Sequence, residues 1–165
     1  MSENRAFEVS ARGEAGTGNQ VLTFLLDGEE YGVDILCVQE IRGWEKPTKV
    51  PSTPSYVRGV INIRGSIVPI VDLRERFGLA ACEPSPTTVV IVLRAERAGT
   101  TLTTGIVVDA VSEVYTLDEQ AVKPPPDFGT AAESRFARGL ATVDQKMLIL
   151  LGTDQLLSAQ VELAA

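Results

Sequence analysis

The chain contains no histidine among its 165 residues. Without an imidazole it lacks the usual general base of catalytic triads and Cys–His pairs, the commonest zinc ligand and any site for phosphohistidine. The phosphate-binding motif G-x-x-x-x-G-K-[ST] and the nucleophile motif G-x-S-x-G are missing too. Residues 13–18 are glycine-rich, but they precede every predicted strand, so no helix N-terminus follows them to bind phosphate. The sequence therefore argues against an enzyme.

Aromatic residues, cysteines and long apolar runs are also scarce. Aromatics are 5% of the chain, so Val, Ile and Leu must build the core. The two cysteines, Cys37 and Cys82, are far apart, which favours reduced thiols over a disulfide. The longest apolar runs are far shorter than the roughly 18 residues that span a bilayer, and the N-terminus lacks an apolar signal segment. We expect a cytoplasmic protein, and its net charge of -7 disfavours nucleic acid and anionic lipid as partners.

What the chain does contain is an internal repeat. Residues 31–41 align with residues 104–114, with a glycine, a valine and a glutamate in register. Residues 58–63 align with residues 138–143, and each of these segments is followed by a second apolar run. Two similar halves predict two similar small β units with a groove between them, and such a groove is a place for a partner.

Short apolar runs between turn signals, with little helix, predict small β-barrels rather than a βαβ sheet. The pseudo-repeat spans roughly residues 20–80 and 87–151, and closing each half into a barrel would remove exposed strand edges. Residues 1–19 lack periodicity and predict a flexible tail in front of a domain at 20–165, which ends in a helix.

Local signals refine this outline. Asp34 is expected to cap a short helical turn, and Asp72 is expected to cap a short helix that Gly78 ends. Pro69 lies inside the apolar run 67–71, where it removes a hydrogen-bond donor, so that strand is expected to be at an edge or bulged.

Several blocks of the sequence together form a specific pattern. The most specific is Gly-Val-Ile-Asn-x-Arg-Gly-x-x-x-Pro-x-x-Asp-Leu at residues 59–73, and the others are residues 30–35, 38–43, 107–114 and 147–150. These blocks resemble those of the CheW family of bacterial chemotaxis coupling proteins, and the resemblance covers about residues 20–160.

The resemblance implies a mainly β fold of two intertwined SH3-like barrels, each of five strands. It also implies a non-enzymatic adaptor without a cofactor. Such an adaptor joins the cytoplasmic tip of methyl-accepting chemoreceptors to the regulatory domain of the histidine kinase CheA, within membrane-associated receptor arrays. That regulatory domain has the same fold, and the two proteins pack end to end into rings.

The same resemblance implies a receptor-binding surface. Glu40 and Arg64 would form an ion pair that shapes the groove, or one that only fixes strand register. Val38 and Val114 would form an apolar groove floor for a receptor helix, or plain barrel core. For Gly59 the alternative to receptor contact is a backbone conformation that needs no Cβ. The residues carried over are Ile35, Val38, Glu40, Gly59, Arg64 and Val114.

Two residues beside a proline-rich insertion, Lys123 and Phe128, are carried over to the kinase-binding surface. The family's basic residue there is expected to be arginine, and lysine cannot make a planar fork, so this contact would be weaker or different. The alternative is a solvated loop lysine and a core phenylalanine.

Two other functions stay open at this point. One is a CheW-like adaptor of a chemosensory pathway that does not serve motility, which sequence blocks do not separate from chemotaxis. The other is a small-molecule-binding double barrel, disfavoured by the lack of histidine, of a nucleotide loop and of clustered aromatics.

Overall fold

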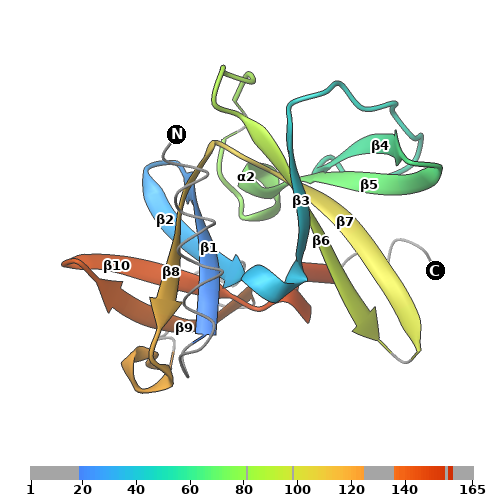
Figure 1. The fold of residues 1–165 in the computed structure, drawn as a ribbon. Helices are drawn as coiled ribbons and strands as arrows, with labels where there is room; N and C mark the ends of the chain where they lie inside the picture. Colours follow the sequence, from blue (N-terminus) through green and yellow to red (C-terminus); the bar gives the residue numbers. More distant parts are fainter. Residues whose placement is uncertain (1–18, 81, 98, 125–135, 155, 158–165) are drawn as a thin grey trace.

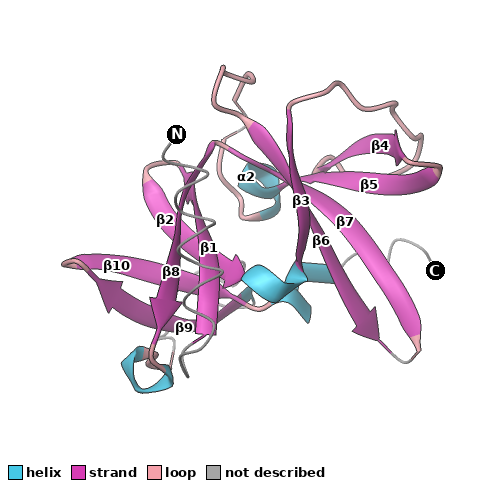
Figure 2. Ribbon diagram, in the orientation of Figure 1, coloured by secondary structure: helices cyan, strands magenta, loops and turns pink. Residues whose placement is uncertain are grey.

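The computed structural model describes residues 19–80, 82–97, 99–124, 136–154 and 156–157. Its regular structure is mainly strand, and the strands form two five-stranded sheets lying side by side (Figures 1 and 2). The strands are β1 Asn19–Leu26, β2 Glu29–Asp34, β3 Val38–Gly43, β4 Val57–Ile63, β5 Ser66–Asp72, β6 Val89–Arg97, β7 Thr100–Val108, β8 Ala110–Leu117, β9 Ala137–Val143 and β10 Lys146–Leu151. The short helical elements are η1 Ile35–Cys37, α2 Leu73–Arg76 and η2 Glu119–Ala121.

The two halves of the chain exchange strands. Sheet A has the order β8-β1-β2-β10-β9, and sheet B has the order β3-β6-β7-β5-β4. Each half therefore gives its first hairpin to one sheet and its last three strands to the other. The expectation that each half closes on itself is wrong, because the chain passes to the other sheet after β2 and again after β7. Strands β1 to β5 of the first half correspond in order to strands β6 to β10 of the second half. When each strand is replaced by its counterpart, the order of one sheet becomes the order of the other. The two halves are therefore related by a pseudo-twofold axis.

The pseudo-symmetry holds at single residues where the halves meet. In sheet A, Gly32 of β2 pairs in parallel with Leu150 of β10. In sheet B the aligned Gly105 of β7 pairs in parallel with Ile70 of β5. A Cβ on Gly105 would lie 2.8 Å from the side chains of Ile70 and Val90, so an alanine here would force these packed side chains to shift.

The largest hydrophobic core lies between the sheets. It joins Leu22 and Phe24 of sheet A to Ile91 and Ile106 of sheet B, all at most 2% exposed. The few aromatics are concentrated there in a chain of rings with centroids 5.5–6.0 Å apart: Phe24, Tyr31, Phe77 and Phe136. Smaller clusters fill the inner face of each sheet. The core between the sheets holds them in one orientation, because their contact buries large apolar side chains.

The local expectations are largely confirmed. The Asp34 carboxylate accepts a hydrogen bond from the Leu36 N–H at 3.0 Å and caps η1. The Asp72 carboxylate accepts one from the Arg74 N–H at 3.0 Å and caps α2, after which Gly78 has φ +83°. Of the expected C-terminal helix, the structure describes only residues 153, 154, 156 and 157, all helical.

The expectation for Pro69 is wrong. Strand β5 is an inner strand, and its register shift against β4 lies elsewhere, between Val57 and Gly59. The parallel pairing of β5 with β7 begins only at Ile70. At Pro69, the side of β5 that faces β7 therefore has no partner among the described strands. A residue without an N–H is tolerated in an inner strand where one side is unpaired.

Among the described residues, no helix has the length and apolar character needed to cross a membrane.

Candidate functional site

A groove of about 690 Å³ runs between the two sheets. It brings together four of the six residues predicted to bind a receptor: Ile35, Val38, Glu40 and Val114. The other residues that line it are Leu22, Gln39, Ile41, Pro86, Thr87, Val89, Ala110, Val111, Ser112 and Glu113.

The two walls of the groove are the two copies of the sequence repeat. One wall is the first part of β3 and the other is the first part of β8, and these strands are counterparts under the pseudo-twofold axis. Val38 faces the groove from one wall and the aligned Val111 from the other, so the floor is apolar. The groove thus lies on the pseudo-twofold axis, which is why the aligned segments meet across it.

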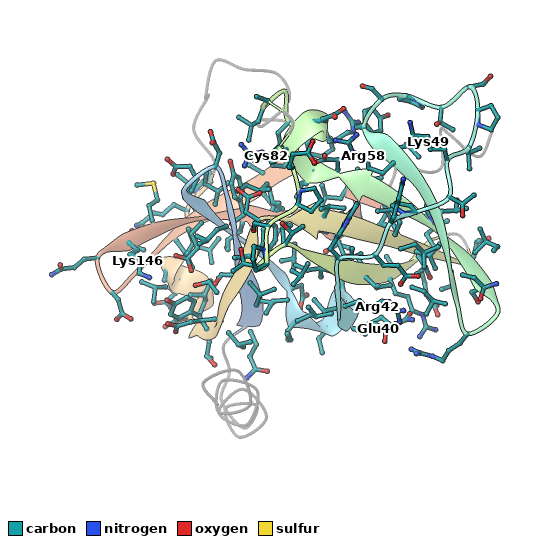
Figure 3. The ribbon with its side chains drawn as sticks, turned by 90° about the horizontal axis from the view of Figure 1, so that it is seen from above. Glu40, Arg42, Lys49, Arg58, Cys82 and Lys146 are labelled. Atoms are coloured by element: carbon teal, nitrogen blue, oxygen red, sulfur yellow. The ribbon has the colours of Figure 1, made fainter. Side chains whose placement is uncertain are left out.

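One rim of the groove carries a network of charges. Arg64 Nη2 lies 3.1 Å from Glu40 Oε1, and Arg42 Nη1 lies 3.4 Å from Glu40 Oε2. Arg42 also reaches Glu45 at 3.4 Å, and Figure 3 shows Glu40 and Arg42 next to each other. The Arg64 side chain is 67% exposed, so this pair adds at most about 1 kcal/mol to stability. Its position leaves the guanidinium available to a partner.

The other rim has a lone carboxylate. Glu113, the counterpart of Glu40, is exposed, and within the described ranges no ion pair reaches it. Asp144 stands in the β9–β10 turn where Arg64 stands in the β4–β5 turn, with nearly the same φ, 51° against 50°. The backbone of Glu113 is held by Thr23, whose hydroxyl lies 3.0 Å from its N–H and 3.1 Å from its carbonyl oxygen. The groove is therefore apolar at its floor and acidic on this rim.

Gly59 lies outside the residues that line the groove. Its φ is +141°, and a Cβ there would collide with the carbonyl oxygen of Thr48. Thr48 and Val60 exchange two backbone hydrogen bonds of 2.9 Å beside it. The counterpart Gly139 faces the Lys123 carbonyl oxygen in the same way, with a Cβ-to-oxygen distance of 2.9 Å. These contacts agree with the backbone alternative for Gly59.

Of the predicted kinase-binding pair, the structure describes only Lys123. Its N–H and carbonyl exchange hydrogen bonds of 2.8 and 2.9 Å with Leu140 of β9, and its side chain is exposed. Phe128 lies outside the described residues. Lys123 is away from the groove, at the β9 edge of sheet A.

Four large apolar side chains are exposed in the described part of the chain, Leu36, Val50, Ile67 and Met147, and the sequence reasoning did not single out any of them. Two of the four are equivalent in the two halves. Ile67 of β5 is 62% exposed and Met147 of β10 is 61% exposed. They hold equivalent places in the two halves, each following a hairpin turn. The sequence could have revealed them, because both are large apolar residues at outward-facing positions of strands that align in the two halves.

Sheet A carries a polar cluster at its hairpin end. The Glu30 carboxylate is 8% exposed and lies 3.5 Å from Lys146 Nζ. The charge of Glu30 is the main reason that the pKa of Lys146 is raised. Burial, together with the charge of Glu113, raises the pKa of Tyr115. In the described part of the chain, no three His, Cys, Asp or Glu side chains come together as a metal site.

Comparison with known proteins gives a consistent result. Residues 20–161 match the model of the CheW-like domain. Chemotaxis protein CheW of Klebsiella aerogenes is 42% identical over 143 residues, which are 87% of this chain and 84% of that protein. Chemotaxis protein CheW of Rhizobium meliloti is 36% identical, over 90% of this chain and 93% of that protein. The crystal structure of the scaffolding protein TtCheW from Thermoanaerobacter tengcongensis is similar with a TM-score of 0.73 and 37% identity, covering 82% of this chain and 89% of that one.

Proposed function

Because this chain belongs to the CheW family, we propose that it is a non-enzymatic adaptor that couples chemoreceptors to the histidine kinase CheA in bacterial chemotaxis. Two relatives that it matches over most of their length are named chemotaxis protein CheW, and a similar solved structure is that of a scaffolding protein. The adaptor works in the cytoplasm, at arrays of membrane-bound receptors, and acts by holding its partners in place.

The groove is the receptor site in this proposal. The observation that carries it is an open apolar floor on the pseudo-twofold axis, with Glu40 on one wall and Glu113 on the other. An apolar floor of this kind suits the apolar face of a helix. The two carboxylates favour a helix that carries basic side chains beside that face.

The kinase binds elsewhere, at the end of sheet A. Lys123 beside β9 and Met147 on β10 are both exposed on this sheet and lie outside the groove. An exposed methionine suits an interface with another β domain, because its flexible side chain adapts to the opposing surface. Separate surfaces allow one adaptor to hold receptor and kinase together.

The test is receptor binding by matched variants. Arg64→Ala removes the charged rim residue, and Asp144→Ala makes the corresponding change in the other hairpin at the same backbone φ. Affinity for a purified receptor cytoplasmic fragment is measured by isothermal titration calorimetry, and folding is checked by thermal unfolding. We expect Arg64→Ala to weaken binding about tenfold, a loss of about 1.4 kcal/mol, and Asp144→Ala to leave it unchanged.

The outcomes separate the parts of the proposal. Equal losses in both variants would contradict the assignment of the groove rim. A wild-type protein that binds neither the receptor fragment nor the regulatory domain of its cognate kinase would contradict the coupling function itself.

A further inference from the structure

Arg74 of α2 joins three segments of the chain. Its Nη1 lies 2.6 Å from Asp109 Oδ2 and its Nη2 lies 3.3 Å from Asp27 Oδ1. Its Nε donates a 3.0 Å hydrogen bond to the carbonyl oxygen of Ala80. The Arg74 side chain is only 15% exposed, against 67% for Arg64 on the groove rim.

Asp109 is the residue at which the chain crosses between the sheets. Strand β7 of sheet B ends at Val108, and strand β8 of sheet A begins at Ala110. The Asp109 N–H donates to the Leu25 carbonyl at 3.0 Å, and its own carbonyl accepts from the Thr87 hydroxyl at 2.9 Å. Its Oδ2 also accepts from the Asp27 N–H at 2.9 Å. The crossover is thus held by both its backbone and its side chain.

The crossover leads directly into the β8 wall of the groove. Ala110, the next residue, lines the groove, and so does Thr87, which is bonded to the Asp109 carbonyl. Arg74 itself lines a different cavity of about 440 Å³. Figure 3 shows Arg58 and Cys82 of that cavity on the opposite side of the molecule from Glu40. Arg74 does not line the groove, and its shortest ion pair is to Asp109, which directly precedes the groove residue Ala110.

The other crossover is held differently. Between β2 and β3 the chain turns through η1, and Asp34, at its start, accepts a hydrogen bond from the Leu36 N–H. Within the described part of the chain, no basic side chain pairs with Asp34. In the described structure, the crossover that leads into the β8 wall is therefore joined by an ion pair to the first half of the chain, through Arg74. Among the described residues, the crossover that leads into the β3 wall has no such ion pair to the second half.

We infer that Arg74 is a positioning residue for the groove: through Asp109 it fixes the β8 wall relative to β3. That the groove binds a receptor helix rests on the proposed function, whereas the effect of Arg74 on the arrangement of the two sheets does not. Without Arg74, the crossover keeps its backbone hydrogen bonds but loses the cation that joins it to α2 and to the β1–β2 turn. The two walls then sample a wider range of separations.

Arg58 offers a matched control. It also pairs with two carboxylates, Asp72 and Glu75, both at 2.8 Å, but all three residues belong to the β4–β5–α2 segment. Arg58→Ala therefore removes a comparable ion-pair network without touching the crossover. Arg74→Lys is a second comparison, because it keeps the charge opposite Asp109 but loses the planar fork that also reaches Asp27 and Ala80.

The first experiment measures the arrangement of the sheets directly. Spin labels at Ser66→Cys in β5 and Thr142→Cys in β9, in a Cys37→Ser/Cys82→Ser background, report the distance between the outer ends of the two sheets by pulsed electron paramagnetic resonance. We expect Arg74→Ala to broaden or shift the distance distribution, Arg74→Lys to restore part of it, and Arg58→Ala to leave it unchanged. An unchanged distribution in Arg74→Ala, or equal changes in Arg74→Ala and Arg58→Ala, would overturn the inference.

The second experiment measures receptor-fragment affinity in the same variants without labels. Arg74→Ala should bind about tenfold more weakly than Arg58→Ala, although neither residue lines the groove. If the wild type does not bind the fragment, the proposed function fails while the distance measurement still decides the role of Arg74. If Arg74→Ala does not fold, Asp109→Ala replaces it: it removes the carboxylate through which Arg74 is proposed to act, at a side chain that is 35% exposed. An unchanged distance distribution in that folded variant would count against the inference.

Discussion

Sheets A and B share one strand order and one pattern of close glycine contacts, but their hairpin ends carry different chemistry. The end of sheet B carries Arg64 and Arg42. The corresponding places in sheet A hold Asp144 and Tyr115. The repeat thus preserved the residues on which the backbone depends and diverged in the side chains that a partner would meet. Differences between the two sheets are therefore the best guide to what each surface binds.

The buried polar residues differ in the same way. Glu30 of sheet A is 8% exposed, and in the described structure no hydrogen-bond donor reaches its Oε2. The aligned residue of sheet B is Thr103, which is neutral. A buried carboxylate is costly unless it is paired, so Glu30 of sheet A needs the charge of Lys146 beside it. Sheet B has the neutral Thr103 at the aligned position, so it needs no lysine there.

The largest effect should come from breaking the glycine equivalence. Gly59→Ala places a Cβ against the Thr48 carbonyl at φ +141°. We expect a loss of about 3 kcal/mol in the free energy of unfolding, because backbone strain and a clash with backbone add together. Gly139→Ala meets the Lys123 carbonyl at 2.9 Å without a positive φ, and should lose about half as much. Urea unfolding of both variants measures the difference.

This comparison also decides how Gly59 is read. If Gly59→Ala keeps its stability but loses receptor binding, the residue acts by contact and the backbone account is wrong. If both variants lose stability in the expected order, receptor binding should fall only in proportion to the unfolded fraction.

A smaller effect should separate Met147 from its counterpart Ile67, the equivalent exposed apolar residues of the two sheets. Met147→Glu should weaken binding to the kinase regulatory domain about tenfold, or about 1.4 kcal/mol, because it places a charge in the surface that we propose for the kinase. Both side chains are more than 60% exposed, so neither change should alter stability by more than about 0.5 kcal/mol.

Ile67→Glu is the matched change on sheet B. Unchanged kinase binding in Ile67→Glu would limit the kinase surface to sheet A. A loss equal to that of Met147→Glu would show that both sheet ends bind the kinase. Calorimetry with the purified regulatory domain distinguishes these results, and normal binding by Met147→Glu would contradict the proposed surface.

The smallest effect should appear only at alkaline pH and only in sheet A. Glu30 raises the pKa of Lys146, so the stability from this pair is present below the unfolded pKa and is lost as pH rises through the folded one. Burial raises the pKa of Tyr115, so the fold disfavours the phenolate, and stability again falls as pH rises past about 10. Both shifts act in the same direction. Between pH 8 and 11, the melting temperature of Tyr115→Phe should fall less steeply with pH than that of the wild type. Identical slopes of melting temperature against pH would refute this account.

Much of the fold could be predicted from the sequence because its signals are local. Asp34 and Asp72 cap the next turn through their own side chains, and Val-, Ile- and Leu-rich runs form strands wherever their partners lie. The failures concern pairing between distant segments. The strand around Pro69 was expected to be at an edge or bulged, because the sequence does not show that pairing on one side of β5 begins only at Ile70. The position of Arg74 against Asp109 and Asp27 likewise depends on segments far apart in the chain.

The candidate site shows the same division. The motif residues Val38, Glu40 and Arg64 were found in the sequence because they lie in short aligned blocks. Their meeting with the β8 wall was decided by tertiary structure, because the exchange of strands between the halves puts β3 in one sheet and β8 in the other. By itself, the sequence determined the strands, the repeat and the caps. Only the tertiary structure decided which strands pair and where the groove opens, because burial of the shared core between the sheets selects one pairing among several that local preferences allow.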